Sequence, residues 1–431
     1  MKFINTRKIH FVGIGGIGVS AMARMALIEG KRVTGSDTNE SEIINELKKL
    51  GAVIKIGHNE KNIEHETDLV VYSPAIPRDN VEMVMAKKLN IRTISYPQSL
   101  GDVSENKYTI AVSGTHGKTT TTAMLADILR DGYLDPTVVV GSLLKRGKTN
   151  FIHGKSKFFI AEACEYKRSF LQLQPNVLVI TNIDFDHLDY FKNLVDIQRA
   201  FRELVSKMGE RDYVVCNPND KMIAPALSKC VSKIIDYTTQ GATGLKLKIP
   251  GKHNIQNALA CLAVANILGI NHSDAIKSLN NFEGTWRRFE LKGQTKKRTL
   301  IYDDYAHNPT EIQATLEGAR ELFKNKKITV IFQPHLYSRT KIFLNDFSRS
   351  FGSVDRVIVL PIYAAREQED PEINSKMLAS GIKKYNKETY YIEYEQIMNE
   401  FNSDMFGSED VIITMGAGDV YKVGEKILFK K

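Results

Sequence analysis

The sequence predicts an α/β protein of three domains, each built on a mostly parallel sheet. The chain has 431 residues, which exceeds what one hydrophobic core usually organises. Short runs of β-branched residues alternate with apolar residues at helical spacing along the chain. Two of these runs end in a Gly-containing turn, at residues 13–18 and 114–117. We expect domains at residues 1–106, 107–290 and 291–431.

The first domain has the layout of a Rossmann-like dinucleotide fold. A strand at Lys8–Val12 leads into the Gly-rich turn, a helical pattern follows at 21–28, and the next strand ends at Asp37. In this layout the glycines allow a tight turn against a diphosphate, and the acidic residue reaches a ribose hydroxyl. Alone, these features would also suit an NAD-dependent oxidoreductase. A third strand ends in the polar segment Ser73–Ile76, which either lines a ligand or is a plain turn.

The second domain opens with a phosphate-binding loop. A predicted strand at Tyr108–Val112 is followed by Gly114, Gly117, Lys118 and Thr119, and then by a helical pattern. In a P-loop the backbone N–H groups hold the phosphates, the Lys reaches the β and γ oxygens, and the hydroxyl binds Mg²⁺. The usual pattern has a glycine where this chain has Val112, so the loop is a variant. We expect ATP as its ligand.

Polar side chains follow the later strands of the second domain. Glu162 and Glu165 end a strand that starts at Phe158, and a second buried strand is followed by Asn182, Asp184, Asp186 and His187. Ligands of doubly wound sheets collect at the carboxyl ends of the strands, so these groups should converge on the loop. Oxygen ligands suit Mg²⁺. A helix N-cap role for Asp184 and Asp186 remains equally open. The helix that starts near residue 250 could present His253, Asn254 and Asn257 to a ligand.

The third domain repeats the alternation of strands and helices and is expected to be Rossmann-like. Strands near residues 300 and 328 lead into polar residues, and strands near residues 356 and 411 complete the alternating unit. The segment before this domain holds the only Trp beside Arg287 and Arg288, where a guanidinium could reach a phosphate or carboxylate, or form a surface ion pair. Three lobes with two phosphate sites imply chemistry between domains and a closing motion.

The amino-acid composition and net charge exclude several classes of function. The net charge of +9 comes from scattered basic groups without a nucleic-acid module, so we expect small phosphorylated substrates and no nucleic acid. The four cysteines contain no Cys-x-x-Cys pair, which argues against a disulfide framework and a structural zinc site and fits a reducing cytosol. No apolar run is long enough to suggest secretion or membrane insertion. A monomer or a homodimer is expected.

With these motifs in this order, the chain resembles the Mur ligases of peptidoglycan synthesis over essentially its whole length. Ser113–Thr121 is similar to the family's ATP loop, which accounts for the missing early glycine. The opening Ile9–Gly18, together with Asp303–His307 and Phe332–His335, looks like the alanine-adding member.

The resemblance implies a cytoplasmic enzyme that uses ATP and Mg²⁺ to join L-alanine to the carboxylate of UDP-N-acetylmuramate through an acyl phosphate. It implies catalytic roles for Lys118, His187, Arg288, His335 and Arg339. It places ATP at Gly114, Thr115, His116, Gly117, Lys118, Thr119, Thr120, His253, Asn254 and Asn257. It gives the metal to Thr119, Glu162 and His187. The substrates would lie at Gly15, Gly16, Ser73, Ala75, Ile76, Tyr305 and His307.

Several positions depart from the family pattern, and related activities remain as alternatives. Cys164, Asn308 and Leu336 replace residues common in relatives, so we assign them no role, and the stretch at 238–249 is short. A recycling ligase that adds a tripeptide and a folate-type polyglutamate ligase are the nearest alternatives. An NAD-dependent oxidoreductase and a nucleic-acid-binding ATPase are the alternatives of other classes.

Overall fold

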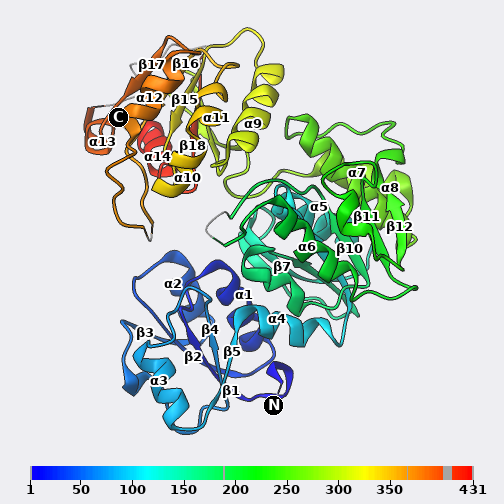
Figure 1. Cartoon of the computed structure of the whole chain (residues 1–431). Helices are drawn as coiled ribbons and strands as arrows, with labels where there is room; N and C mark the ends of the chain where they lie inside the picture. The colour runs from blue at the N-terminus through cyan, green and yellow to red at the C-terminus, as the bar shows by residue number, and fades with distance from the viewer. Residues whose placement is uncertain (1, 188–189, 366, 401–409, 430–431) are drawn as a thin grey trace. The chain divides into compact units, whose positions relative to one another are not determined.

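The structure is a computed structural model that describes residues 2–187, 190–365, 367–400 and 410–429. Its contacts divide the chain into two compact units. The first comprises residues 1–245 and 257–282, and the second comprises residues 246–256 and 283–431. Figure 1 shows three α/β regions in chain order, each with helices against a central sheet.

The first sheet is five-stranded and parallel, in the order β3-β2-β1-β4-β5. Its strands are β1 Lys8–Val12, β2 Arg32–Asp37, β3 Val53–Ile56, β4 Leu69–Tyr72 and β5 Arg92–Ser95. The accompanying helices are α1 Ile17–Ile28, α2 Glu42–Lys49, α3 Val81–Lys88 and α4 Tyr96–Ser104. Every residue of β1 is buried, as expected for a parallel strand covered on both faces. This is the Rossmann-like order that the opening motif predicts.

The second sheet has seven strands in the order β12-β11-β10-β6-β9-β7-β8. Its strands are β6 Tyr108–Ser113, β7 Thr137–Leu144, β8 Thr149–Ile152, β9 Phe158–Glu162, β10 Val177–Ile180, β11 Tyr213–Cys216 and β12 Lys233–Asp236. The helices are α5 Lys118–Asp131, α6 Leu194–Val205 and α8 His272–Asn281. All neighbours pair in parallel except β7 and β8. The carboxyl ends of β6, β9 and β10 therefore meet at one edge.

The third sheet belongs to the second unit and has the order β13-β14-β18-β15-β16-β17. Its strands are β13 Glu290–Gln294, β14 Leu300–Asp304, β15 Ile328–Phe332, β16 Arg356–Val359, β17 Thr389–Tyr391 and β18 Val411–Met415. Its helices are α9 Pro309–Leu322, α10 Tyr337–Ile342, α11 Leu344–Arg349, α12 Ser375–Lys383, α13 Tyr394–Glu400 and α14 Tyr421–Phe429. Only β13 pairs antiparallel.

Helix α7, Lys252–Ile267, is shared by the two units. Its first five residues belong to the second unit, and the rest belong to the first. The three predicted α/β sheets are thus confirmed, whereas the boundaries after residues 106 and 290 stay predictions.

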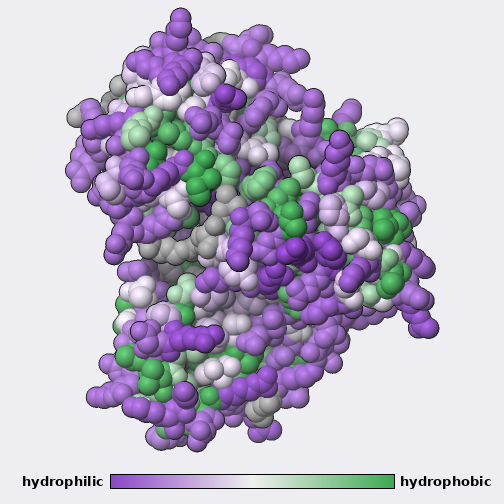
Figure 2. Space-filling view, in the orientation of Figure 1, coloured by the Kyte–Doolittle hydropathy of each residue, from purple (hydrophilic) through white to green (hydrophobic). Residues whose placement is uncertain are grey.

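The face of the molecule shown in Figure 2 is mostly polar. Figure 2 shows a predominantly hydrophilic face on which apolar residues form small separate groups. Among the residues that the structure describes, no helix is long and apolar enough to span a membrane. The four cysteines are free thiols, of which Cys164 is exposed.

Candidate active site

The phosphate loop runs from the end of β6 at Ser113 to the start of α5 at Lys118. Gly114 and Gly117 have φ angles of 134° and 84°, which L side chains rarely adopt. A Cβ on Gly114 would lie 2.0 Å from Thr181 Oγ1, and one on Gly117 would lie 2.5 Å from Asn257 Oδ1. Both positions therefore require glycine, and the Asn257 side chain lies against the loop, whereas its contact with a nucleotide stays a prediction.

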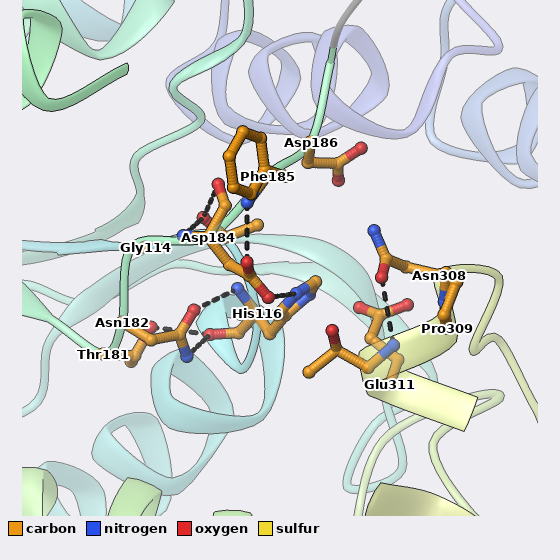
Figure 3. A network of polar contacts seen from close by, with 12 residues as sticks. Gly114, His116, Thr181, Asn182, Asp184, Phe185, Asp186, Asn308, Pro309 and Glu311 are labelled. Atoms are coloured by element: carbon orange, nitrogen blue, oxygen red, sulfur yellow. Dashed lines mark hydrogen bonds and ion pairs between the residues drawn. The ribbon is translucent and has the colours of Figure 1, made fainter. Parts of the chain in front are cut away.

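The end of β10 holds the loop in place through polar contacts (Figure 3). The amide of His116 donates to Asn182 Oδ1 at 2.9 Å, and Thr181 Oγ1 donates to the His116 carbonyl at 2.6 Å. The backbone N–H of Asp184 donates to Thr115 Oγ1 at 2.8 Å, and the Asp184 carboxylate lies 3.6 Å from His116 Nε2. Asp184 is thus part of the loop's support. The alternative N-cap role for it is wrong, because Asn193 caps α6.

Lys118 sits at the head of α5 and is held by three oxygens. Its Nζ donates to the Gly114 carbonyl at 2.5 Å, to the Thr115 carbonyl at 2.9 Å and to Glu165 Oε1 at 3.1 Å. Glu165 is 2% exposed, and its second carboxylate oxygen, Oε2, also lies 3.0 Å from Lys118 Nζ. Burial alone would lower the pKa of Lys118, but the carboxylates of Glu165 and Glu162 raise it above its usual value. The side chain is therefore a fixed cation at the phosphate loop.

Thr119 and Glu162 form the oxygen pair expected for a divalent cation. Thr119 Oγ1 donates to Glu162 Oε1 at 3.1 Å, and the Gly141 amide donates to Glu162 Oε2 at 2.8 Å. Thr120 follows in the first turn of α5 and is buried. Among the described residues no group of three or more His, Cys, Asp or Glu side chains could hold a metal by itself. A hydroxyl and a carboxylate nevertheless suit Mg²⁺, which takes many of its ligands from phosphates and water.

His187 lies beyond β10 on the side of Glu165. Its ring packs on Tyr166 at 4.6 Å between centroids, and Nε2 is 3.9 Å from Glu165 Oε1. Its φ of 53° is left-handed, and the Asp186 carboxylate accepts its amide at 2.7 Å. The observed contacts link His187 to Glu165, and they do not link it to the Thr119–Glu162 pair.

The glycine turn of the first sheet lies between the ends of β1, β2 and β4. The Gly15 amide donates to Asp37 Oδ2 at 2.8 Å, and Gly16 is the exposed N-cap residue of α1. A Cβ on Gly13 would lie 3.1 Å from Ser73 Cβ and 3.4 Å from Ile76. Ser73 Oγ accepts the exposed Ala75 amide at 3.3 Å. The predicted substrate residues of this region therefore share one edge of the sheet.

The second unit brings together most of its own predicted site residues. The Tyr305 and His307 rings are 5.4 Å apart, and those of His307 and His335 are 5.9 Å apart. Arg339 Nη1 is 3.2 Å from His335 Nδ1, and the Arg288 guanidinium lies 5.3 Å from the Tyr305 ring. A cationic and aromatic cluster thus forms at the carboxyl ends of β14 and β15.

Sequence reasoning missed Tyr363, and for Arg287 it did not foresee the buried ion pair that the structure shows. Tyr363 stacks on His335 with centroids 5.8 Å apart, and nothing in its local sequence signals this contact. Arg287 is 2% exposed and donates to Asp303 Oδ2 at 2.7 Å and to the carbonyls of Gly416 and Gly418. The adjacent arginines therefore differ. Arg287 fixes the segment to β14 and β18, and Arg288 remains half-buried beside Tyr305.

The remaining predicted positions are placed as follows. His253 and Asn254 lie in the part of α7 that belongs to the second unit, where Asn254 Nδ2 donates to the Pro250 carbonyl at 2.6 Å. Their approach to a nucleotide stays a prediction. Asn308 caps α9 by accepting the Thr310 amide at 3.1 Å, and Leu336 has a φ of 71° before α10.

A phosphate loop with carboxylates at neighbouring strand ends, in a chain that also carries a glycine turn on a Rossmann-like sheet, defines a nucleotide-dependent enzyme. Comparison with known proteins specifies it further. Residues 8–108 match the model "Mur ligase family, catalytic domain", residues 112–243 match "Mur ligase middle domain", and residues 287–418 match "Mur ligase, glutamate ligase domain". The chain belongs to the Mur ligase family.

The relatives compared below are all named as UDP-N-acetylmuramate–alanine ligases. The chain is 42% identical to the UDP-N-acetylmuramate–L-alanine ligase of Clostridium acetobutylicum, with 99% of this chain and 98% of that protein covered. It is 43% identical to the enzyme of the same name from Caldanaerobacter subterraneus, with 98% and 97% covered. The crystal structure of UDP-N-acetylmuramate–alanine ligase from Thermotoga maritima matches with a TM-score of 0.82 at 32% identity, covering 97% of this chain and 98% of that one.

Proposed function

We propose that this protein joins L-alanine to the carboxylate of UDP-N-acetylmuramate at the expense of ATP, as a step of peptidoglycan precursor synthesis. The supporting observation is the phosphate loop with Lys118 at the head of α5, in a chain similar over nearly its full length to ligases of that activity. ATP dependence belongs to the family, and the loop supplies its site.

The chemistry explains why ATP is needed. A carboxylate is a poor acyl donor because its oxygen leaves badly, so transfer of the γ-phosphate creates an acyl phosphate with a good leaving group. The alanine amine then attacks the acyl carbon, and phosphate leaves. Lys118 stabilises the charge that develops on the phosphoryl oxygens, which is the dominant form of catalysis in phosphoryl transfer.

Mg²⁺ is part of the proposal. Thr119 Oγ1 and Glu162 would hold it, since they meet beside the phosphate loop and supply hard oxygen ligands. When bound, the cation neutralises charge on the phosphates. His187 is the weaker candidate ligand, because its observed neighbours are Glu165 and Tyr166.

The cluster of the second unit is proposed to serve the amino acid and the acyl phosphate. Arg288 and Arg339 bring cationic groups near the Tyr305, His307 and His335 rings. Such groups suit the carboxylate of alanine and the departing phosphate. Because ATP and a UDP-sugar are intracellular metabolites, we place the reaction in the cytoplasm.

Phosphate release with ATP, Mg²⁺ and UDP-N-acetylmuramate tests this function. Release that requires L-alanine, with a product heavier by one alanyl residue, is the expected result. Release with a tripeptide and none with alanine would assign the recycling activity instead. Absence of nucleotide turnover with any amine would contradict the ligase assignment.

A further inference from the structure

Helix α10 carries Arg339 and begins directly after His335 and Leu336, yet its own sequence gives it no side-chain cap. The N-cap residue is Leu336, which has a φ of 71° and a side chain that cannot accept a hydrogen bond. The helix spans only six residues, and the N–H groups of its first turn have no partner within the helix. Short helices without caps fray in water. The first turn of α10 therefore depends on a partner from elsewhere in the chain.

That partner is Glu367, in the segment that connects β16 to α12 (the connecting segment, residues 360–365 and 367–374). Its Oε2 accepts the Ser338 backbone N–H at 3.1 Å, and its Oε1 accepts the Ser338 hydroxyl at 2.5 Å. Ser338 is the second residue of α10, and its N–H is one of those that an N-cap side chain normally satisfies. A carboxylate also interacts favourably with the positive end of a helix. Glu367 thus does for α10 what Leu336 cannot.

The connecting segment contacts the region of His335 and α10 at two further places. The N–H and carbonyl of Tyr363 pair with the backbone on either side of His335, and the Tyr363 ring stacks on the imidazole with 14° between the planes. Farther along, Asp370 and Glu372 form ion pairs with the exposed Lys341 of α10. Exposed ion pairs contribute little. The half-buried contact of Glu367 with Ser338 is therefore the one that fixes the start of the helix.

The position of this first turn decides where Arg339 points. Arg339 follows Ser338 directly, and its Nη1 lies 3.2 Å from His335 Nδ1. The direction in which a helical side chain leaves the backbone is set by its turn of the helix. If the first turn of α10 frays, the guanidinium moves away from the cationic and aromatic cluster. A misplacement of about 1 Å can lower a reaction rate about a hundredfold.

We propose that Glu367 is a positioning residue that caps α10 from outside the helix and thereby holds the Arg339 guanidinium toward the substrates of the second unit. Glu367 acts through Ser338 and touches no reacting group itself. The identity of those substrates, the alanine carboxylate and the acyl phosphate, rests on the proposed function, whereas the link between Glu367 and α10 does not.

Steady-state kinetics test the positioning role. Glu367→Ala should lower kcat/KM for alanine at least about tenfold, because it frees the first turn of α10. The KM values for ATP and UDP-N-acetylmuramate should stay within about twofold, since the phosphate loop and the glycine turn lie in the first unit. Glu367→Gln should keep at least about half of kcat/KM for alanine, because its amide can accept the Ser338 N–H and donate to the Ser338 hydroxyl.

Glu369→Ala is the matched control. It removes an exposed carboxylate of the same connecting segment, and in the described part of the chain Glu369 has no hydrogen bond to α10. This variant should leave kcat/KM for alanine unchanged. A loss equal to that of Glu367→Ala would show that the charge of the segment matters and the contact with Ser338 does not.

Hydrogen exchange of the full chain tests the contact without any substrate. In Glu367→Ala the backbone amides of residues 337–342 should exchange at least about tenfold faster than in the unmodified protein. In Glu367→Gln they should exchange at nearly the unmodified rate. The amides of residues 375–383, in α12, serve as the internal reference and should not change.

A double-variant cycle shows whether Glu367 acts through Ser338. Ser338→Ala removes the hydroxyl and keeps the backbone N–H, so it should lower kcat/KM for alanine less than Glu367→Ala does. The two substitutions together should lower it no further than Glu367→Ala alone, because both act on one contact. An additive loss would overturn the role proposed for Glu367.

The outcomes separate this role from the proposed function. Normal kcat/KM for alanine in Glu367→Ala, unchanged amide exchange in α10, or faster exchange in α12 as well would overturn the positioning role. A loss in Glu367→Gln as large as that in Glu367→Ala would overturn it too. If the unmodified protein shows no alanine-dependent phosphate release, the proposed function fails, and the exchange rates of the two variants still decide whether Glu367 holds α10.

Discussion

Lys118 carries two roles that one substitution would disturb together. It faces the phosphate loop, and it is the cation 3.0 Å from the buried Glu165 Oε2. We expect Lys118→Ala to lower turnover by a factor of about 100 or more. It should also destabilise the protein by about 3 kcal/mol, because it leaves a buried carboxylate without its partner.

The double variant Lys118→Ala, Glu165→Gln separates these effects. It should recover most of the lost stability, measured by urea unfolding, and none of the lost phosphate release. Normal turnover by a folded Lys118→Ala protein would contradict the loop assignment.

Asp304 makes the stability of the protein depend on pH. Burial raises the pKa of this carboxyl from 3.8 to about 6, against the opposing effects of Arg288 and of the Ala306 and Phe289 amides. The folded state then holds its proton more tightly than the unfolded chain does. Stability from this group is therefore complete below about pH 4 and falls as the pH rises to about 6.

The difference in unfolding free energy between the unmodified protein and Asp304→Asn isolates this contribution. From pH 4 to pH 7 the unmodified protein should lose up to about 3 kcal/mol relative to the variant. Asp79→Asn, at an exposed position, is the control. A difference that rises with pH would contradict the burial of a protonated Asp304.

At the scale of elements, the phosphate loop depends on glycine for two separable reasons. Gly114 combines a left-handed backbone with a Cβ position only 2.0 Å from Thr181 Oγ1. Gly30 has a φ of 75° but open space around its Cβ position. We expect Gly30→Ala to lower the free energy of unfolding by about 1 kcal/mol, because alanine is strained in this backbone conformation.

Gly114→Ala should cost clearly more than Gly30→Ala and should also weaken ATP binding, because the loop must move away from β10. Thermal unfolding and nucleotide titration measure the two quantities. Equal effects of the two substitutions would show that contact with Thr181 does not shape the loop.

Local sequence patterns predicted the helices and strands of the sites well, because the residue preferences of each segment agree with the structure that the segment adopts. The run Tyr108–Val112, the helix after Lys118 and the early Pro309 all appear as expected, in β6, α5 and α9. Glu82 and Arg287 could not be predicted in the same way. In the sequence, Glu82 lies in the first turn of a helix that carries several charged residues, a pattern typical of a helix end at the surface. It is buried by its contacts with β1, β2 and residues 59–62.

At the scale of the whole molecule, the division into units does not follow the chain order. Residues 246–256 belong with the second unit, although they precede most of α7. Gly318 of α9 packs on this segment so closely that a Cβ would lie 2.9 Å from the Gly251 backbone. No local pattern reports such a contact, because it joins segments more than 60 residues apart.

Gly318→Ala tests how far this segment stabilises the second unit. Alanine is the better helix former by up to about 1 kcal/mol, yet we expect a net loss of stability because the backbone of Gly251 must shift. Gly352→Ala, where a Cβ would meet nothing within 4 Å, is the control. An increase in the melting temperature of Gly318→Ala would show that the segment is readily displaced.

The sole tryptophan gives the second unit its own spectroscopic signal. Trp286 packs edge-on against Tyr421 at 5.8 Å and lies 5.8 Å from the Arg287 guanidinium, within the segment that Arg287 fixes to β14 and β18. Emission excited at the red edge of the indole band therefore originates in this unit alone. Circular dichroism, by contrast, averages over all three sheets. If the two signals change at different denaturant concentrations, the units unfold separately. The change in emission then marks the denaturant concentration at which the contacts of Arg287 with β14 and β18 are lost.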